Sequence, residues 1–262
     1  MLKIKIFLLV SLLTYLYADN SPNKLCRELC EGHSNSSCIH NFLLPLDNVC
    51  SEQNITKSMN HLTLLANKDN HHAEFAIGEI YLYGIGMPRN FIKAFEMHER
   101  AYSHGNTGSP IALGKMLVLG QGRKQDCKKG IELLNSRKDD PVSSQILGLI
   151  YFSPSCGDVN LTKAEKYFKY ASEHSISVAQ FYFALLLDKK DSEKNKDEVL
   201  KLITTSAENG YIKAQVLLGH GYILGENIAQ DFKKAKCWIK KAKDQNSTKA
   251  IELWNEYKLW EY

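Results

Sequence analysis

The sequence predicts an all-α protein: an α-solenoid of about five stacked antiparallel helix pairs with helical caps. Three observations support this prediction. A pattern recurs about every 35 residues, the apolar residues inside each copy have helical spacing, and small residues return at fixed places in the period. A fixed period of this size is typical of solenoids, in which each repeat is one supersecondary unit stacked on its neighbours.

The first helix of each pair, here called helix A, is recognised by a small anchor residue. The anchors recur at intervals of 36, 34, 36 and 35 residues and are Gly78, Gly114, Gly148, Ala184 and Gly219. The residues just before them are Ile77, Leu113, Leu147, Phe183 and Leu218. The residues three positions after them are Tyr81, Leu117, Tyr151, Leu187 and Tyr222. These two positions lie one helical turn apart, so they predict one buried stripe on each helix A.

The second helix, helix B, follows after a turn of roughly eight residues. Sixteen positions after the anchors stand Ala94, Gly130, Ala164, Leu200 and Ala235. Nineteen after them stand Met97, Leu133, Tyr167, Ile203 and Trp238, and twenty-three after them Ala101, Arg137, Ala171, Ala207 and Ala242. Spacings of three and four again indicate one helical face. Two helices approach closely only where a side chain is nearly absent, which explains the small residues.

The stretch Tyr81–Asn90, "YLYGIGMPRN", connects the two helices of the first copy and looks at first like a phosphate-binding loop. Its counterparts recur in later copies and tolerate Pro154 where Gly84 stands, so we interpret it as a hinge. We expect Gly84 to end helix A with a positive φ and Gly86 to allow a tight turn. The residues expected to cap helix B are Asn90, Asp126, Asn160 and Asp231.

The fourth copy departs most from the pattern, because the charged run Asp188–Asp197 replaces its turn. We expect a solvated, mobile loop there. A docking site for a charged partner is the alternative.

The repeated pattern A-x-x-x-L-G-x-x-Y-x-x-G-x-G…K-A…K-A-A-x-x-G resembles that of SEL-one-like repeats, relatives of the tetratricopeptide repeats. It is clearest in the copies "AEFAIGEIYLYGIGMPRNFIKAFEMHERAYSHG" and "AQVLLGHGYILGENIAQDFKKAKCWIKKAK". The resemblance covers residues 73–243. It implies an α-solenoid with a concave surface that binds proteins.

The two ends are expected to cover the repeat stack. Residues 54–72 read as a degenerate half repeat, and residues 19–53 as a cysteine-containing N-terminal cap. Residues 244–262 are expected to form a C-terminal cap helix with Ile251, Trp254 and Leu259 on one stripe.

Residues 1–18 have the features of a secretory signal peptide. Two lysines precede the apolar segment Ile6–Leu16, which is too short to span a bilayer, and cleavage is expected after Ala18. An uncleaved anchor is the alternative. No later stretch approaches 18 consecutive apolar residues, so no stable membrane span is expected after cleavage. We expect a periplasmic or secreted protein, or alternatively one of the endoplasmic reticulum lumen.

The chain has seven cysteines behind this export signal, which predicts disulfides in an oxidising compartment. Candidate pairs are Cys26–Cys50, Cys30–Cys38 and Cys127–Cys156. The first two would be nested in the N-terminal cap, where four cysteines also permit two other pairings. The third would join neighbouring turns. Cys237 is expected to be a small buried apolar residue.

No catalytic, cofactor-binding or metal-binding residues are expected. The motifs H-E-x-x-H, G-x-S-x-G and G-x-G-x-x-G are absent, and the pair His71-His72 would point in different directions on a helix. The one S-x-x-K, Ser21 to Lys24, lies in a polar tail that offers neither a rigid base nor an oxyanion hole. The net charge is only +4 and no basic run is interleaved with aromatic residues, so nucleic acid is not an expected partner.

The leading hypothesis is therefore a non-enzymatic binding scaffold, a right-handed superhelix whose helices A line a groove for a protein or peptide. Candidate groove residues are Glu79, Tyr83, Lys115, Val118 and Phe152. Two alternatives remain. Some cysteine-rich bacterial members of the family are described as penicillin binders or β-lactamases, which would make this protein a hydrolase. The other is a luminal adaptor in protein quality control.

Overall fold

The computed structural model describes residues 52–225 and 227–262, and all regular structure in these residues is helical. Consecutive helices pack in antiparallel pairs, as predicted for an α-solenoid. The helices fall into two compact units, and the boundary between them in the sequence lies between Lys138 and Asp139. Each unit is described by itself below.

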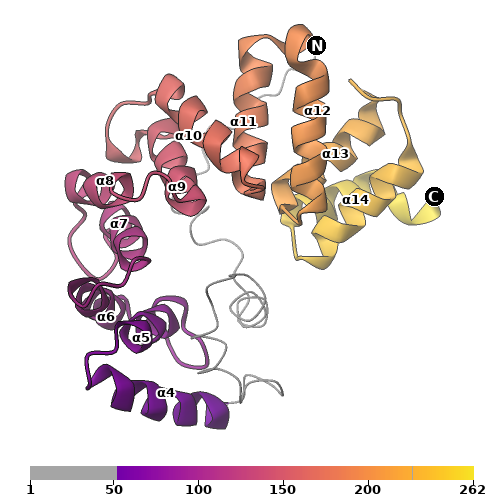
Figure 1. The fold of residues 1–262 in the computed structure, drawn as a ribbon. Helices are drawn as coiled ribbons and strands as arrows, with labels where there is room; N and C mark the ends of the chain where they lie inside the picture. Colours follow the sequence, from indigo (N-terminus) through magenta and orange to yellow (C-terminus); the bar gives the residue numbers. More distant parts are fainter. Residues whose placement is uncertain (1–51, 226) are drawn as a thin grey trace. The chain divides into compact units, whose positions relative to one another are not determined.

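The first unit contains the first two copies of the repeat (Figure 1). Its helices are α4 (Glu52–Ala66), α5 (His71–Tyr83), α6 (Phe91–Ser103), α7 (Ser109–Leu119) and α8 (Cys127–Asn135). Helix α5 packs against α6, and α7 against α8, so each pair is one helix A with its helix B. Helix α4 packs against α5 and thus takes the place of a preceding helix B.

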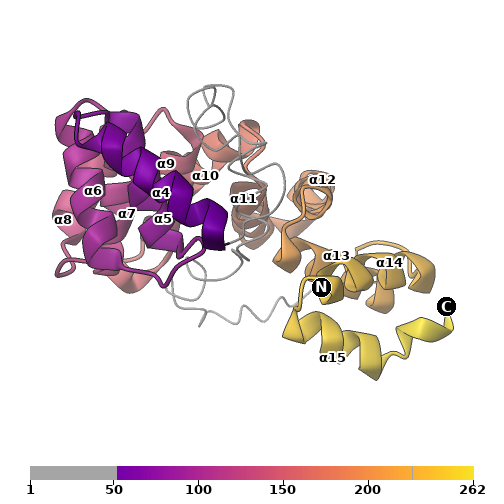
Figure 2. The same cartoon turned by 90° about the horizontal axis from the view of Figure 1, so that it is seen from below.

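The second unit contains the other three copies. Its elements are α9 (Pro141–Phe152), η2 (Pro154–Cys156), α10 (Leu161–Glu173), α11 (Ser177–Lys190), α12 (Ser192–Glu208), α13 (Ile212–Leu224), α14 (Phe232–Asp244), α15 (Thr248–Glu256) and η3 (Leu259–Glu261). The pairs are α9–α10, α11–α12 and α13–α14. Helix α15 packs against α14 after the last copy (Figure 2).

The anchor glycines mark the closest approach of each helix A to its helix B. A Cβ added to Gly78 would lie 2.7 Å from the ring of His98, and one added to Gly148 would lie 2.6 Å from the ring of Phe168. Neither distance is tolerated, so only glycine fits. The residues that fill these spaces stand twenty positions after the anchors, one place beyond the stripe predicted from sequence. They are His98, Leu134, Phe168 and Ile239, each with no exposed surface.

The hinge interpretation of Tyr81–Asn90 is confirmed. Gly84 ends α5 in the left-handed region with φ 69°, and Gly86 has φ 63°. The side chain of Asn90 accepts a hydrogen bond from the backbone N–H of Lys93 and so caps α6. The predicted caps Asp126, Asn160 and Asp231 act in the same way on α8, α10 and α14.

A lysine in helix B stacks on the tyrosine of helix A in three copies. The pairs are Lys93 over Tyr81, Lys163 over Tyr151 and Lys234 over Tyr222, with 4.8–5.4 Å between the amine and the ring centroid. This cation–π contact gives a physical reason for the Lys-Ala pair at the start of each of these helices B.

The expectation of a mobile loop in the fourth copy is wrong. The run Asp188–Asp197 is helical except at Asp191, which has extended backbone and separates α11 from α12. The side chain of Asp191 accepts a hydrogen bond from the backbone N–H of Lys194. One residue therefore both ends α11 and caps α12, and the charged side chains lie on helical surfaces.

The C-terminal segment differs from the single predicted stripe. Lys258 adopts the left-handed region with φ 46°, and this ends the helical run before η3. Leu253 and Leu259 are buried, whereas Ile251 is 39% exposed. The signal peptide, nearly all of the N-terminal cap and its four cysteines lie outside the described residues. Within the described helices, none has the length and apolar content needed to cross a membrane.

Candidate functional site

Three of the five candidate groove residues come together where α5 meets α7. The Lys115 amine of α7 donates a hydrogen bond to the hydroxyl of Tyr83 in α5 over 3.4 Å and lies 5.4 Å from the centre of its ring. Glu79 stands one turn before Tyr83 on the same helix. All three side chains are half-buried. We call Glu79, Tyr83 and Lys115, together with Arg89, the α5–α7 cluster.

The charges of the α5–α7 cluster are unevenly matched. Glu79 lies 3.3 Å from Nε2 of the fully buried His98. Arg89 donates a hydrogen bond from Nε to the backbone carbonyl of Tyr83 over 3.2 Å. Burial lowers the pKa of Lys115, while Glu79 acts to raise it and Arg89 to lower it further. Of the described carboxylates, none lies within ion-pair distance of Lys115 or Arg89.

The other two candidate groove residues lie elsewhere. Val118 is only 1% exposed, so its assignment to a groove surface is wrong. It packs against helix B of the same copy, where a Cβ on Gly130 would lie 2.8 Å from its Cγ2. Phe152, in the second unit, is half-buried and makes edge-to-face contacts with Phe168 and Tyr182. It therefore belongs to an aromatic cluster between neighbouring helices.

The second unit contains a pocket of about 80 Å³ between α11, α12 and α13. Its lining is mainly apolar and includes Val199, Leu200, Ile203, Leu217, Leu218 and Leu224. Asp188 at the end of α11, with Ser192 and Lys196 in the first turns of α12, supplies polar groups on one side. The Ser192 hydroxyl donates to Asp188 over 2.8 Å. Lys196 is exposed and has no ionic partner among the described residues. Leu224 is 41% exposed, so the pocket opens to solvent.

Sequence analysis did not identify this pocket, although one signal was present. Leu200 occupies a place in the period where the other copies have Ala or Gly. A large side chain at this position marks the copy that differs from the others, and Leu200 lines the pocket. Arg89 and His98 were missed for another reason, since neither belongs to a register that repeats by residue type.

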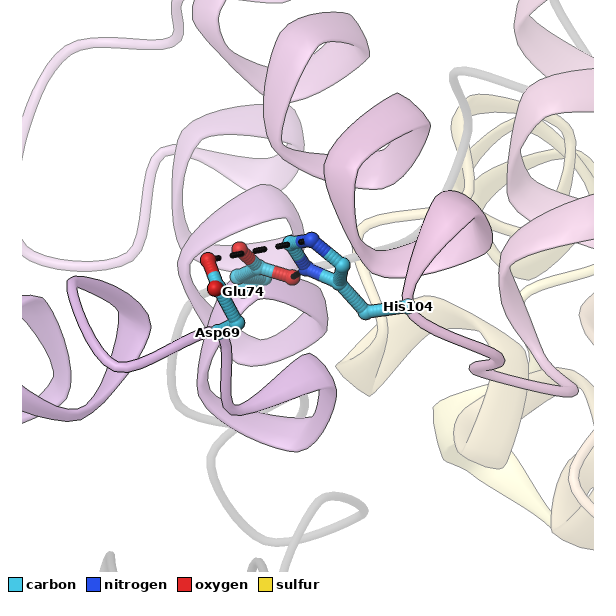
Figure 3. A group of neighbouring side chains, drawn as sticks. All are labelled: Asp69, Glu74 and His104. Atoms are coloured by element: carbon cyan, nitrogen blue, oxygen red, sulfur yellow. Dashed lines mark hydrogen bonds and ion pairs between the residues drawn. The ribbon is translucent and has the colours of Figure 1, made fainter.

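A group of ionisable side chains joins the start of α5 to the end of α6 in the first copy (Figure 3). Glu74, which has no exposed surface, lies 2.8 Å from Nδ1 of His104 and 2.9 Å from Nη2 of Arg100. Asp69 lies 3.7 Å from Nε2 of His104 and 3.8 Å from Arg100. Oxygen and nitrogen atoms converge here as in a metal site, but Arg100 already supplies the cation. We interpret the group as an ion-pair network.

The described cysteines divide into two kinds. Cys127 and Cys156 are each disulfide-bonded, whereas Cys237 is free. Cys237 is exposed on α14, so the expectation that it is buried is wrong. The pairing of Cys127 with Cys156 stays a sequence prediction, and non-reducing peptide mapping would test it.

The helix pairs described above correspond to a known repeat family. The Sel1 repeat family model matches residues 71–106, 111–136, 146–175 and 212–247, which are the first, second, third and fifth copies. The chain is a Sel1-repeat protein. The fourth copy lies outside the matched ranges, yet α11 and α12 form a helix pair of the same kind.

Solved structures agree with the assignment of the fold. A Sel1 repeat protein from Oxalobacter formigenes superposes with a TM-score of 0.62 at 22% identity, covering 74% of this chain and 86% of that one. A protective antigen of uropathogenic Escherichia coli strains, described as displaying an SLR fold, has a TM-score of 0.56 at 22% identity. That alignment covers 87% of this chain but 46% of the antigen. A search of the curated proteins gives no match.

Proposed function

We propose that this Sel1-repeat protein is an exported scaffold that binds a protein or peptide partner through side chains on its helix pairs. The observation that carries this proposal is the apolar pocket between α11, α12 and α13. Two neighbouring repeats supply its walls, so binding there uses the surface that stacking creates.

The shape and chemistry of the pocket support a peptide ligand. Its volume of about 80 Å³ suits one apolar side chain rather than a large cofactor. The polar groups of Asp188, Ser192 and Lys196 stand beside the apolar lining, where they can bond to the backbone or to neighbouring side chains of a bound segment. Burial of an apolar side chain provides affinity, and the polar groups provide orientation.

Selection from a random peptide library displayed on phage, with the full chain as bait, tests this proposal. We expect enriched sequences with a recurring apolar residue. Leu224→Glu should weaken their binding about tenfold or more, because it places a charge at the pocket mouth. Leu64→Glu is the matched control, since Leu64 is 64% exposed on α4 and lies outside the pocket lining. Failure of the wild-type chain to enrich any sequence would overturn the proposal.

Export is part of the same proposal. It is supported by the signal-like residues 1–18 and by the disulfide bonds of Cys127 and Cys156, because disulfides persist in oxidising compartments.

A further inference from the structure

The α5–α7 cluster presents positive charge that the described residues do not neutralise. Lys115 and Arg89 carry two cations, and no carboxylate of the described residues lies within ion-pair distance of either. Glu79, the nearby anion, already contacts His98 at 3.3 Å. The cluster therefore keeps excess positive charge, with Lys115 half-buried and Arg89 exposed.

Lys115 differs from an ordinary surface lysine because its charged amine is partly removed from water. A half-buried ammonium loses hydration, and its remaining contacts are the ring and hydroxyl of Tyr83. Burial lowers the pKa of Lys115, and Glu79 offsets this effect only in part. A bound anion would neutralise the charge of the Lys115 amine. The site is partly desolvated, and a charge-assisted hydrogen bond is stronger there than in water.

From this geometry we infer that the α5–α7 cluster is a recognition site for a carboxylate on an acidic side chain of the protein partner. The Lys115 amine would donate hydrogen bonds to the carboxylate, and Arg89 would add a second positive charge. The contact of Glu79 with Nε2 of His98 at 3.3 Å would hold Glu79 on its own side of the cluster. This inference rests on the proposed function, and it names the chemistry of the partner at a site separate from the apolar pocket.

A matched pair of variants separates recognition from general surface charge. Lys115→Met keeps the length of the side chain and removes its charge. Lys93→Met does the same for a lysine that stacks on Tyr81 at 5.2 Å, much as Lys115 stacks on Tyr83, but that lies outside the cluster. Circular dichroism melts of both variants verify that they fold.

The probe is the same phage-displayed random peptide library, presented to the full chain. We expect the pool enriched on the wild type to contain an excess of Asp and Glu over the starting library. That excess should disappear on Lys115→Met and persist on Lys93→Met. A synthetic acidic peptide from the enriched pool should bind Lys115→Met about tenfold more weakly by fluorescence anisotropy, and Arg89→Gln should weaken it less.

The outcomes distinguish this inference from the proposed function. If peptides are enriched without an acidic excess, or if Lys115→Met selects the same acidic peptides as the wild type, the carboxylate site is overturned and the scaffold function stands. If no peptide is enriched on the wild type, both are overturned.

Discussion

At the residue scale, three of the five copies contain a partly buried polar contact that joins the start of helix A to the end of helix B, and its chemistry differs between them. In the first copy the contact is between Glu74 and His104. In the fourth it is the Asn209 amide donating to Gln180 over 3.3 Å, and in the fifth the Gln245 amide donating to Gln215 over 2.9 Å. The first copy thus uses an ionisable pair for a contact that two amides make in the fourth and fifth copies.

Loss of the buried carboxylate should destabilise the first unit. Glu74→Ala leaves Arg100 and His104 without the Glu74 carboxylate. We expect this change to lower the free energy of unfolding by about 1–3 kcal/mol. The value is below that of a fully buried pair because Arg100 and His104 are 42% and 32% exposed. Urea denaturation measures it. The double change Glu74→Gln with His104→Asn copies the Gln180–Asn209 pair and should recover most of the loss; equal destabilisation by both variants would contradict this account.

Lys115 should make stability depend on pH in a defined direction. Burial lowers its pKa from 10.5, so the unfolded chain binds this proton more readily than the folded one. The contribution of Lys115 to stability therefore rises as the pH rises from the folded pKa towards 10.5. We expect the free energy of unfolding of the wild type, minus that of Lys115→Met, to increase between neutral pH and about pH 10.5. Urea titrations at a series of pH values measure this difference. The tyrosines common to both variants cancel in this difference, and a flat difference would refute the prediction.

At the element scale, the fourth copy shows how one residue can replace a turn. Asp191 takes φ −163° and caps α12, so α11 leads directly into a helix of 17 residues. The first turns of α12 place Ser192 and Lys196 in the pocket lining. The pocket consequently depends on the point at which α12 begins.

Removal of this cap should loosen the pocket locally. Asp191→Ala deletes the acceptor for the Lys194 N–H and should lower stability by about 1 kcal/mol. Hydrogen exchange should accelerate over residues 192–197. Asn160→Ala removes the equivalent cap of α10 and serves as the control, with a similar loss of stability but unchanged exchange in α12. If residues 192–197 exchange no faster than the rest of α12 in either variant, Asp191 does not determine where α12 begins.

At the scale of the whole molecule, the proposal of export leads to a direct prediction about the mature chain. Expression with an intact secretion pathway should give a protein whose N-terminus is Asp19, because Ala18 is the small residue at the expected cleavage site. Intact mass and N-terminal sequencing measure this. Retention of Met1 on an exported, membrane-attached protein would favour the uncleaved anchor, and its retention on an unexported protein would exclude the signal peptide.

The sequence by itself determined the helix pairs, their order and their hinges, because these depend on local chemistry that recurs with the period. These features act within a few residues, so their spacing in the sequence predicts them. They are the small residues at the anchors, the capping side chains such as Asn90 and the positive φ of Gly84. The grouping of Glu79, Tyr83 and Lys115 could be proposed from the same register.

Only the tertiary structure decided which of these positions are buried and which charges are matched. Val118 and Leu200 look alike in sequence as apolar helical residues, but one packs against a glycine in its own pair and the other lines a pocket. The contacts of Arg89 and His98 also depend on neighbouring helices rather than on the period. The repeat pattern specifies how each pair folds, whereas burial and charge pairing depend on the side chains that adjacent pairs bring together.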